Sequence, residues 1–146
     1  MIELHESLIG HRSIDFDRRA LRKAVREGAK LVRREGRKLA GRKQGAGRHY
    51  RVWGDTPHQA SAPGAPPAKL TGALQRSIYY RTMEKGGMSM SVGPSTSKRR
   101  AFYSRFLAFG TKNMDARPFM GDALERQESR VRGLLREALR DSLVPR

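Results

Sequence analysis

Residues 17–41 read DRRALRKAVREGAKLVRREGRKLAG, and this stretch decides the fold class of the chain. Apolar and small residues recur in it at steps of four, three, four, four and three, which traces one face of an α-helix. Asp15 and Asp17 stand at its start, where the helix dipole favours negative charge, and Gly41 ends the pattern. The stretch therefore predicts a long helix, whose repeating face consists of Leu21, Val25, Gly28, Val32, Gly36 and Leu39.

Two positions on this face are glycines, although each glycine destabilises a helix by about 1 kcal/mol relative to alanine. Glycine has no side chain to hold a neighbour away. We therefore expect the backbone of another element to approach the helix closely at Gly28 and Gly36.

The same helix carries a regular series of cations spaced four residues apart. Like charges at this spacing destabilise an isolated helix by a few tenths of a kcal/mol per pair. The series therefore favours contact with an acidic surface, either DNA phosphates or a protein. The alternative is a solvated helix face. The series consists of Arg18, Arg22, Arg26, Lys30, Arg34 and Lys38.

The whole chain of 146 residues shares this basic character. It has 31 Lys and Arg residues and 14 Asp and Glu residues, which give a net charge of +17. Such an excess favours an acidic partner, which is a nucleic acid, an anionic membrane or an acidic protein. The membrane is the weakest candidate, since the cationic helix lacks bulky anchors such as Trp or Phe on its face. Hydrophobic residues make up 37%, which predicts a modest core.

Several classes of chemistry are excluded or disfavoured. The chain has no cysteine, which excludes disulfides, thiolate metal sites and cysteine nucleophiles. Its histidines have no metal-ligand spacing, and no serine has a plausible histidine and acid arrangement. We therefore expect no enzyme activity, no cofactor and no metal site. The histidines are His5, His11, His49 and His58.

Targeting signals are also missing from the sequence. No apolar run approaches the roughly 18 residues of a transmembrane helix. The first six residues, MIELHE, lack the basic and apolar regions of a signal peptide. We expect the chain to remain intracellular until a larger structure is assembled or released.

The remaining patterns predict a single α+β domain over residues 1–146. Long N-terminal and C-terminal helices are expected to pack on a small antiparallel β-sheet, with an N-terminal arm at 1–14 and a long Pro/Gly-rich loop at 54–69. The elements predicted after the first helix are a strand at 49–53, a short helix at 70–78, a hairpin at 78–93 that turns at Gly86–Gly87, a helix at 101–109, and a long helix from Pro118 to the residue before Pro145.

Two groups of aromatic residues have ambiguous roles. Tyr50 and Trp53 lie beside Arg48 and Arg51, so they could stack on single-stranded nucleic acid, but we predict that they belong to the core. The same prediction applies to three phenylalanines at helical spacing, Phe102, Phe106 and Phe109.

Residues 101–124 are the most specific part of the sequence. YSRFLAFGT at 103–111 is followed by ARPFM at 116–120 and by AL at 123–124, while PPAKLTGALQRSI stands upstream at 66–78. This arrangement resembles the tail-completion or neck (head-to-tail joining) proteins of long-tailed bacteriophages. That family shows an aromatic helix ending in Phe-Gly-Thr, then Ala-x-Pro-Phe opening the last helix. The chain departs from it at Ala108, where the family often has glutamate.

The motif residues also have a structural meaning of their own. Gly110 can adopt the left-handed conformation that ends a helix, and Pro118 suits a first helical position. Phe109 and Phe119 are expected to close the corner between the two helices as apolar plugs. With Thr111, these residues predict an architectural corner and no catalytic site.

The resemblance implies a virion structural protein of the phage neck, assembled in the host cytoplasm as a ring around the DNA channel. Its expected partners are copies of itself and neighbouring neck and tail proteins, with duplex DNA in the channel lumen as a further candidate, and no membrane. The alternative function is that of a non-specific basic DNA-binding protein whose first helix lies along the backbone. No helix begins with Asn, Gln or Arg residues arranged to read bases, so sequence-specific binding is not expected.

Overall fold

A computed structural model describes residues 17–42, 45–95 and 102–143. It confirms the α+β class. The predicted N-terminal arm at 1–14 lies outside the described residues. The elements are α1 (Arg18–Leu39), β1 (His49–Val52), β2 (Thr56–Gln59), α2 (Ala73–Ser77), β3 (Ile78–Thr82), β4 (Met90–Pro94), α3 (Ser104–Phe109) and α4 (Met120–Leu143).

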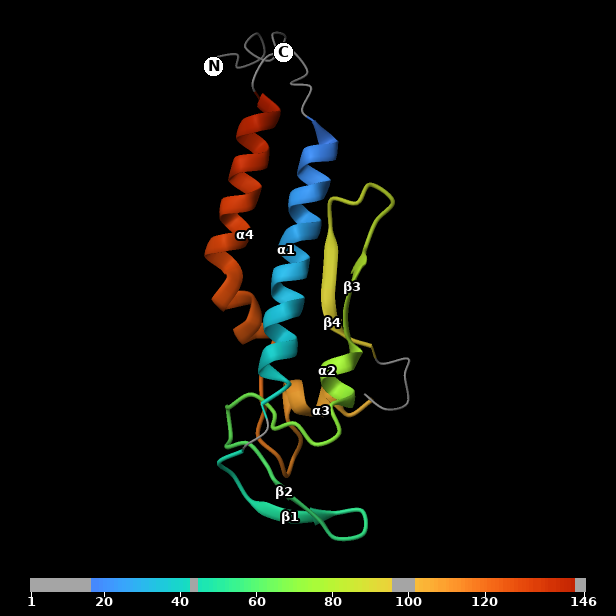
Figure 1. The fold of residues 1–146 in the computed structure, drawn as a ribbon, viewed down its shortest axis with the longest axis vertical. Coiled ribbons are helices and arrows are strands. Elements are labelled where there is room, and N and C mark those ends of the chain that lie inside the picture. Colours follow the sequence, from blue (N-terminus) through green and yellow to red (C-terminus); the bar gives the residue numbers. More distant parts are fainter. Residues whose placement is uncertain (1–16, 43–44, 96–101, 144–146) are drawn as a thin grey trace, which may run out of the picture.

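Helix α1 lies at the centre of the molecule, with α4 running antiparallel along one side and the β3–β4 hairpin along the other (Figure 1). Its first turn is capped by Asp17, whose carboxylate accepts hydrogen bonds from the backbone N–H groups of Arg19 at 2.8 Å and Ala20 at 3.3 Å. This cap satisfies two donors that a helix start otherwise leaves unpaired.

The two glycines of α1 are the points at which α4 comes closest. A Cβ added to Gly28 would stand 3.1 Å from Cγ1 of Val131, and one added to Gly36 would stand 2.9 Å from Sδ of Met120. Another element does come close at both glycines, but the expectation of an approaching backbone is wrong, because the nearest groups are side chains of α4. The small residues thus let two long helices pack with little space between them.

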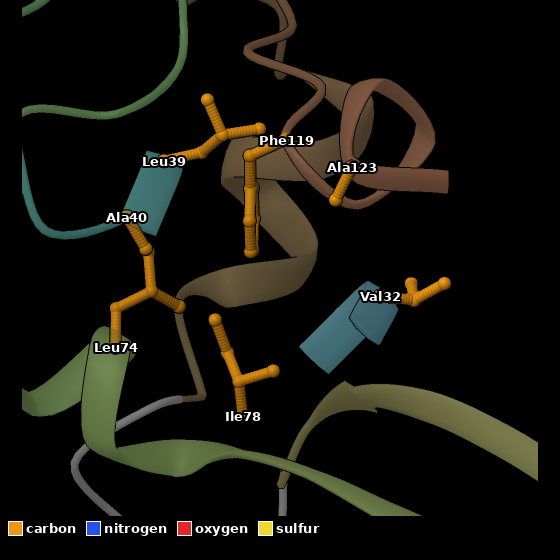
Figure 2. Close-up of a cluster of buried hydrophobic side chains, with 7 residues drawn as sticks. All are labelled: Val32, Leu39, Ala40, Leu74, Ile78, Phe119 and Ala123. Atoms are coloured by element: carbon orange, nitrogen blue, oxygen red, sulfur yellow. The ribbon is translucent and has the colours of Figure 1, made fainter. Parts of the chain in front are cut away.

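The core lies where α1, α2, β3 and α4 meet (Figure 2). Phe119, which directly precedes α4, is 1% exposed and lies in the middle of the cluster. The other buried members come from both long helices, α2 and the start of β3, and they are Val32, Leu39, Ala40, Leu74, Ile78 and Ala123. One aromatic ring therefore joins the long helices to the smaller elements.

The β3–β4 hairpin packs on α1 through arginines. The antiparallel register pairs Ile78 with Pro94 and Thr82 with Met90, which confirms the predicted hairpin. Arg37 donates two hydrogen bonds to the carbonyl oxygen of Ile78, at 3.1 and 2.9 Å, from Nε and Nη2. The guanidinium of Arg33 stands 5.3 Å from the ring centroid of Tyr80. Two cations of α1 thus hold the hairpin.

Two details of the predicted architecture are wrong. The described strands form two separate two-stranded sheets, and α4 packs along α1 instead of on a sheet. The segment 54–69 is only partly a loop, because it contains β2, which pairs with β1. Pro57 is compatible with a strand here since a two-stranded sheet consists of edge strands, whose outer N–H positions need no partner.

The glycine contact predicts opposite effects for two substitutions in the long helices. Gly28→Leu is expected to lower the free energy of unfolding by about 1–3 kcal/mol, because the new side chain would overpack against Val131. Gly133→Ala is the matched control, since Gly133 of α4 is exposed with nothing within 4 Å, and it should raise stability by up to about 1 kcal/mol. Urea denaturation measures both values, and equal stabilities for the two variants would contradict the packing.

Candidate nucleic-acid or protein interface

The predicted series of cations winds around α1. Each step of four residues advances about 40° beyond a full turn, so the five steps from Arg18 to Lys38 cover roughly 200°. Arg22 consequently lies beside the hairpin turn, where a Cβ on Gly87 would meet its Cδ at 3.5 Å. Lys30 donates to Glu27 at 2.7 Å and is half-buried, and this hydrogen bond lowers the pKa of the Glu27 carboxyl.

Apart from Lys30, the members of the series lie at the surface. Arg18, Arg22, Arg26, Arg34 and Lys38 are exposed. The two glutamates of α1 are paired with other cations, since Glu27 accepts from Lys30 at 2.7 Å and Glu35 lies 3.5 Å from Nη1 of Arg126 on α4. The exposed part of α1 is therefore strongly positive and suits an anionic partner.

The aromatic residues predicted for the core lie at the surface instead. Trp53 is 80% exposed and Phe109 is 84% exposed. The other three, Tyr50, Phe102 and Phe106, are also exposed. All five core predictions are therefore wrong.

Helix α3 shows the physical reason for the error. Its buried side consists of Ser104, with Tyr103 and Leu107 packed against the core cluster. The phenylalanines are exposed, and the rings of Phe102 and Phe106 meet edge to face with 6.5 Å between their centroids. Helical spacing places such residues on one side of a helix, but it does not say which side faces inward.

The corner at 109–119 differs from the prediction at Gly110, Pro118 and Phe109, while the predicted burial of Phe119 is confirmed. Gly110 has φ 76° and ψ −178°, a conformation almost restricted to glycine, although it is not the left-handed helical one. A Cβ there would lie 2.8 Å from the carbonyl oxygen of Met114. Thr111 and Met114 exchange two backbone hydrogen bonds, and Pro118 lies two residues before α4 instead of at its first position. Phe119 plugs the corner, while Phe109 points to solvent.

The corner borders a hollow of about 690 Å³ between the β1–β2 hairpin, the 67–74 segment and α3. Its walls are mostly apolar and aromatic, and the ring of Tyr50 meets that of His58 edge to face at 5.3 Å. Burial raises the pKa of the Tyr103 phenol, and a backbone hydrogen bond at Leu74 opposes this effect. The aromatic and large aliphatic lining residues are Tyr50, Val52, Trp53, Leu70, Leu74, Phe102, Tyr103 and Leu107.

The charged residues that line this hollow are all cations, namely Lys69, Arg76 and Arg117. Ser61 also lines it, and its Oγ and the Nε of Arg117 are buried without a hydrogen-bond partner in the described part of the chain. Arg117 does donate from Nη2 to the carbonyl oxygen of Ser61 at 3.2 Å. Sequence reasoning missed this hollow, because its walls come from segments far apart in the chain.

The candidate surfaces are thus a basic helix and an aromatic hollow. Within the ranges that the structure describes, no group of three or more His, Asp and Glu side chains could hold a metal ion. None of the helices described is both long and apolar enough to cross a membrane. What the arrangement offers chemically is binding of anionic and apolar groups.

The two phenylalanines of the corner should differ sharply in their effect on stability. Phe119→Ala removes a fully buried ring and is expected to lower the free energy of unfolding by about 3–5 kcal/mol. Phe109→Ala should change it by no more than about 0.5 kcal/mol, because that ring lies in solvent. Thermal and urea unfolding measure both, and a large loss for Phe109→Ala would contradict the corner described above.

The exposure of Trp53, the one tryptophan of the chain, predicts a spectroscopic property. In dilute solution its fluorescence should have the long-wavelength emission maximum of an indole in water, and acrylamide should quench that fluorescence fully. Emission typical of a buried indole at the lowest protein concentration would contradict this exposure of Trp53.

Comparison of the chain with protein-family models, with curated proteins and with solved structures gives no match.

Proposed function

We propose that this chain is a virion structural protein of the neck of a long-tailed bacteriophage or of a related prophage. In this role it completes or joins the tail at the head–tail interface, as one subunit of a ring around the DNA channel. It acts by binding and not by catalysis, and it needs no cofactor. Its partners are further copies of itself and adjacent neck and tail proteins.

The observation that carries the proposal is the corner at residues 109–119. The Phe-Gly-Thr and Ala-x-Pro-Phe segments on which the resemblance rests also form one structural unit, with Phe119 in the core and glycine required at Gly110. The neighbouring helix α3 presents Phe106 and Phe109 to solvent, and Phe102, two residues before the helix, is exposed as well. Clusters of exposed aromatic side chains mark protein interfaces, as a subunit of an assembly requires.

The basic surface of α1 gives a second line of support. A subunit near a DNA channel must tolerate phosphate without holding it tightly. Arg26, Arg34 and Lys38 are exposed, and in solution they would attract an acidic protein face or the DNA backbone through long-range electrostatics.

Removal of the gene from the phage or prophage that carries it tests the proposal. We expect DNA-filled heads and separate tails in electron micrographs, and a plasmid copy should restore joined, infectious particles. A plasmid copy with Arg26→Glu, Arg34→Glu and Lys38→Glu should fail to restore them while its thermal unfolding stays close to that of the parent chain.

The matched control carries the same change of charge on the other long helix. Arg130→Glu, Arg136→Glu and Arg140→Glu alter exposed residues of α4, and this variant should restore infectivity. Normal joined particles without the gene would overturn the proposal. Nanomolar binding of the isolated protein to a defined DNA sequence at physiological salt would instead favour a DNA-binding protein.

A further inference from the structure

We propose that the hollow beside α3 binds residues 1–16 of a second copy of this chain. The contact deepens the proposed ring assembly by naming the surfaces through which its subunits join. Its test needs no phage particle, so the contact and the phage function can fail separately.

The hollow has the composition of a binding site for an extended apolar segment. It has room for several side chains, with a volume of about 690 Å³, and its walls include Trp53, Leu70 and Phe102, all of which are exposed. Large aromatic and aliphatic groups left in solvent around a concave surface gain free energy when an apolar partner covers them. Residues 1–16 supply such a partner through Ile2, Leu4, Leu8, Ile9, Ile14 and Phe16.

Charge complementarity selects the same segment. The charged residues among the described lining are Lys69, Arg76 and Arg117, all positive. Lys69 and Arg76 converge over Gly72, where an added Cβ would meet Nη1 of Arg76 and Cε of Lys69, each at 3.0 Å. Residues 1–16 hold three acidic residues against one arginine, in a chain whose net charge is +17. Their carboxylates are Glu3, Glu6 and Asp15.

The place where this segment joins the fold favours a second copy over the same one. It precedes α1, whose start lies at the end of the molecule opposite the β1–β2 hairpin (Figure 1). The 22 residues of α1 alone separate the two ends by about 33 Å. Sixteen extended residues span at most about 53–58 Å. To reach the hollow of its own copy, the segment would have to reverse direction at the start of α1, and most of its length would be needed to run back along that helix. A neighbouring copy needs no such reversal.

The geometry of such a contact suits closed assembly. Each copy would donate one segment and accept another at a different surface, which is a heterologous interface. Heterologous interfaces generate rings when the rotation between neighbours closes.

The test uses the full-length chain, with sedimentation velocity and Trp53 fluorescence recorded over a range of protein concentrations. Trp53 lines the hollow and is the only tryptophan, so its emission reports occupancy directly. We expect self-association with a blue shift that grows with concentration. One variant carries Glu3→Lys and Glu6→Lys, and a second carries Lys69→Glu and Arg76→Glu. Each alone should associate at least about tenfold more weakly, because like charges would meet.

Mixing the two variants gives the decisive measurement. The positively charged segment of the first variant complements the negatively charged hollow of the second. The unchanged segment of the second likewise complements the unchanged hollow of the first, so the mixture should regain association and the blue shift. A control with Arg81→Glu and Lys85→Glu, at exposed positions of the β3–β4 hairpin, should associate like the parent chain. Circular dichroism melting checks that every variant is folded.

Three results would overturn the proposal. The first is a chain that stays monomeric at all concentrations. The second is self-association without any change in Trp53 emission, which places the contact elsewhere. The third is a blue shift that does not depend on protein concentration, or a mixture of the two variants that does not regain association. Either result means that each copy fills its own hollow or that the hollow binds a different partner.

Discussion

The close contact between α1 and α4 at Gly28 and Gly36 is the constraint on which the rest of the structure depends. Each glycine lowers the intrinsic stability of α1, yet it lets Val131 and Met120 lie where a larger residue would stand. With α4 on this side, the remaining surface of α1 is divided between the β3–β4 hairpin and solvent. The arginines that hold the hairpin and those that stay exposed follow from that division.

The corner before α4 turns this helix pair into a complete fold. Phe119 joins α1, α2 and β3 through one buried ring. The backbone N–H of Arg117 donates to the carbonyl oxygen of Leu107 at 2.7 Å, and that of Gly64 donates to Ala116 at 3.1 Å. Helix α3 and the 61–65 segment are thereby fixed to the start of α4. The hollow forms because α3 and the 61–65 segment are held at the start of α4, while the β1–β2 hairpin extends beyond them.

Sequence periodicity was sufficient to predict the fold class, and also those elements whose residue pattern is typical of only one kind of secondary structure. The alternation of Met88, Met90 and Val92 predicts a strand, and β4 covers residues 90–94. Periodicity was insufficient for α3, where phenylalanine spacing identifies a side of the helix but tertiary contacts decide that Tyr103 and Leu107 face the core. The four-residue spacing of the cations drifts around the axis of α1, so their sequence pattern does not say which of them share a surface. The hollow had no local signal at all, because residues from parts of the chain that lie far apart in sequence line it.

The spacing of the two glycines also limits how this protein can change length during evolution. Gly28 and Gly36 are matched to Val131 and Met120 on an antiparallel neighbour, so both contacts depend on one register. A single inserted residue between the glycines would rotate the rest of α1 by about 100° and shift it by about 1.5 Å, which would replace one glycine by a charged neighbour. Insertions and deletions should therefore fall outside this part of the helix pair, which should keep a fixed number of residues across homologues.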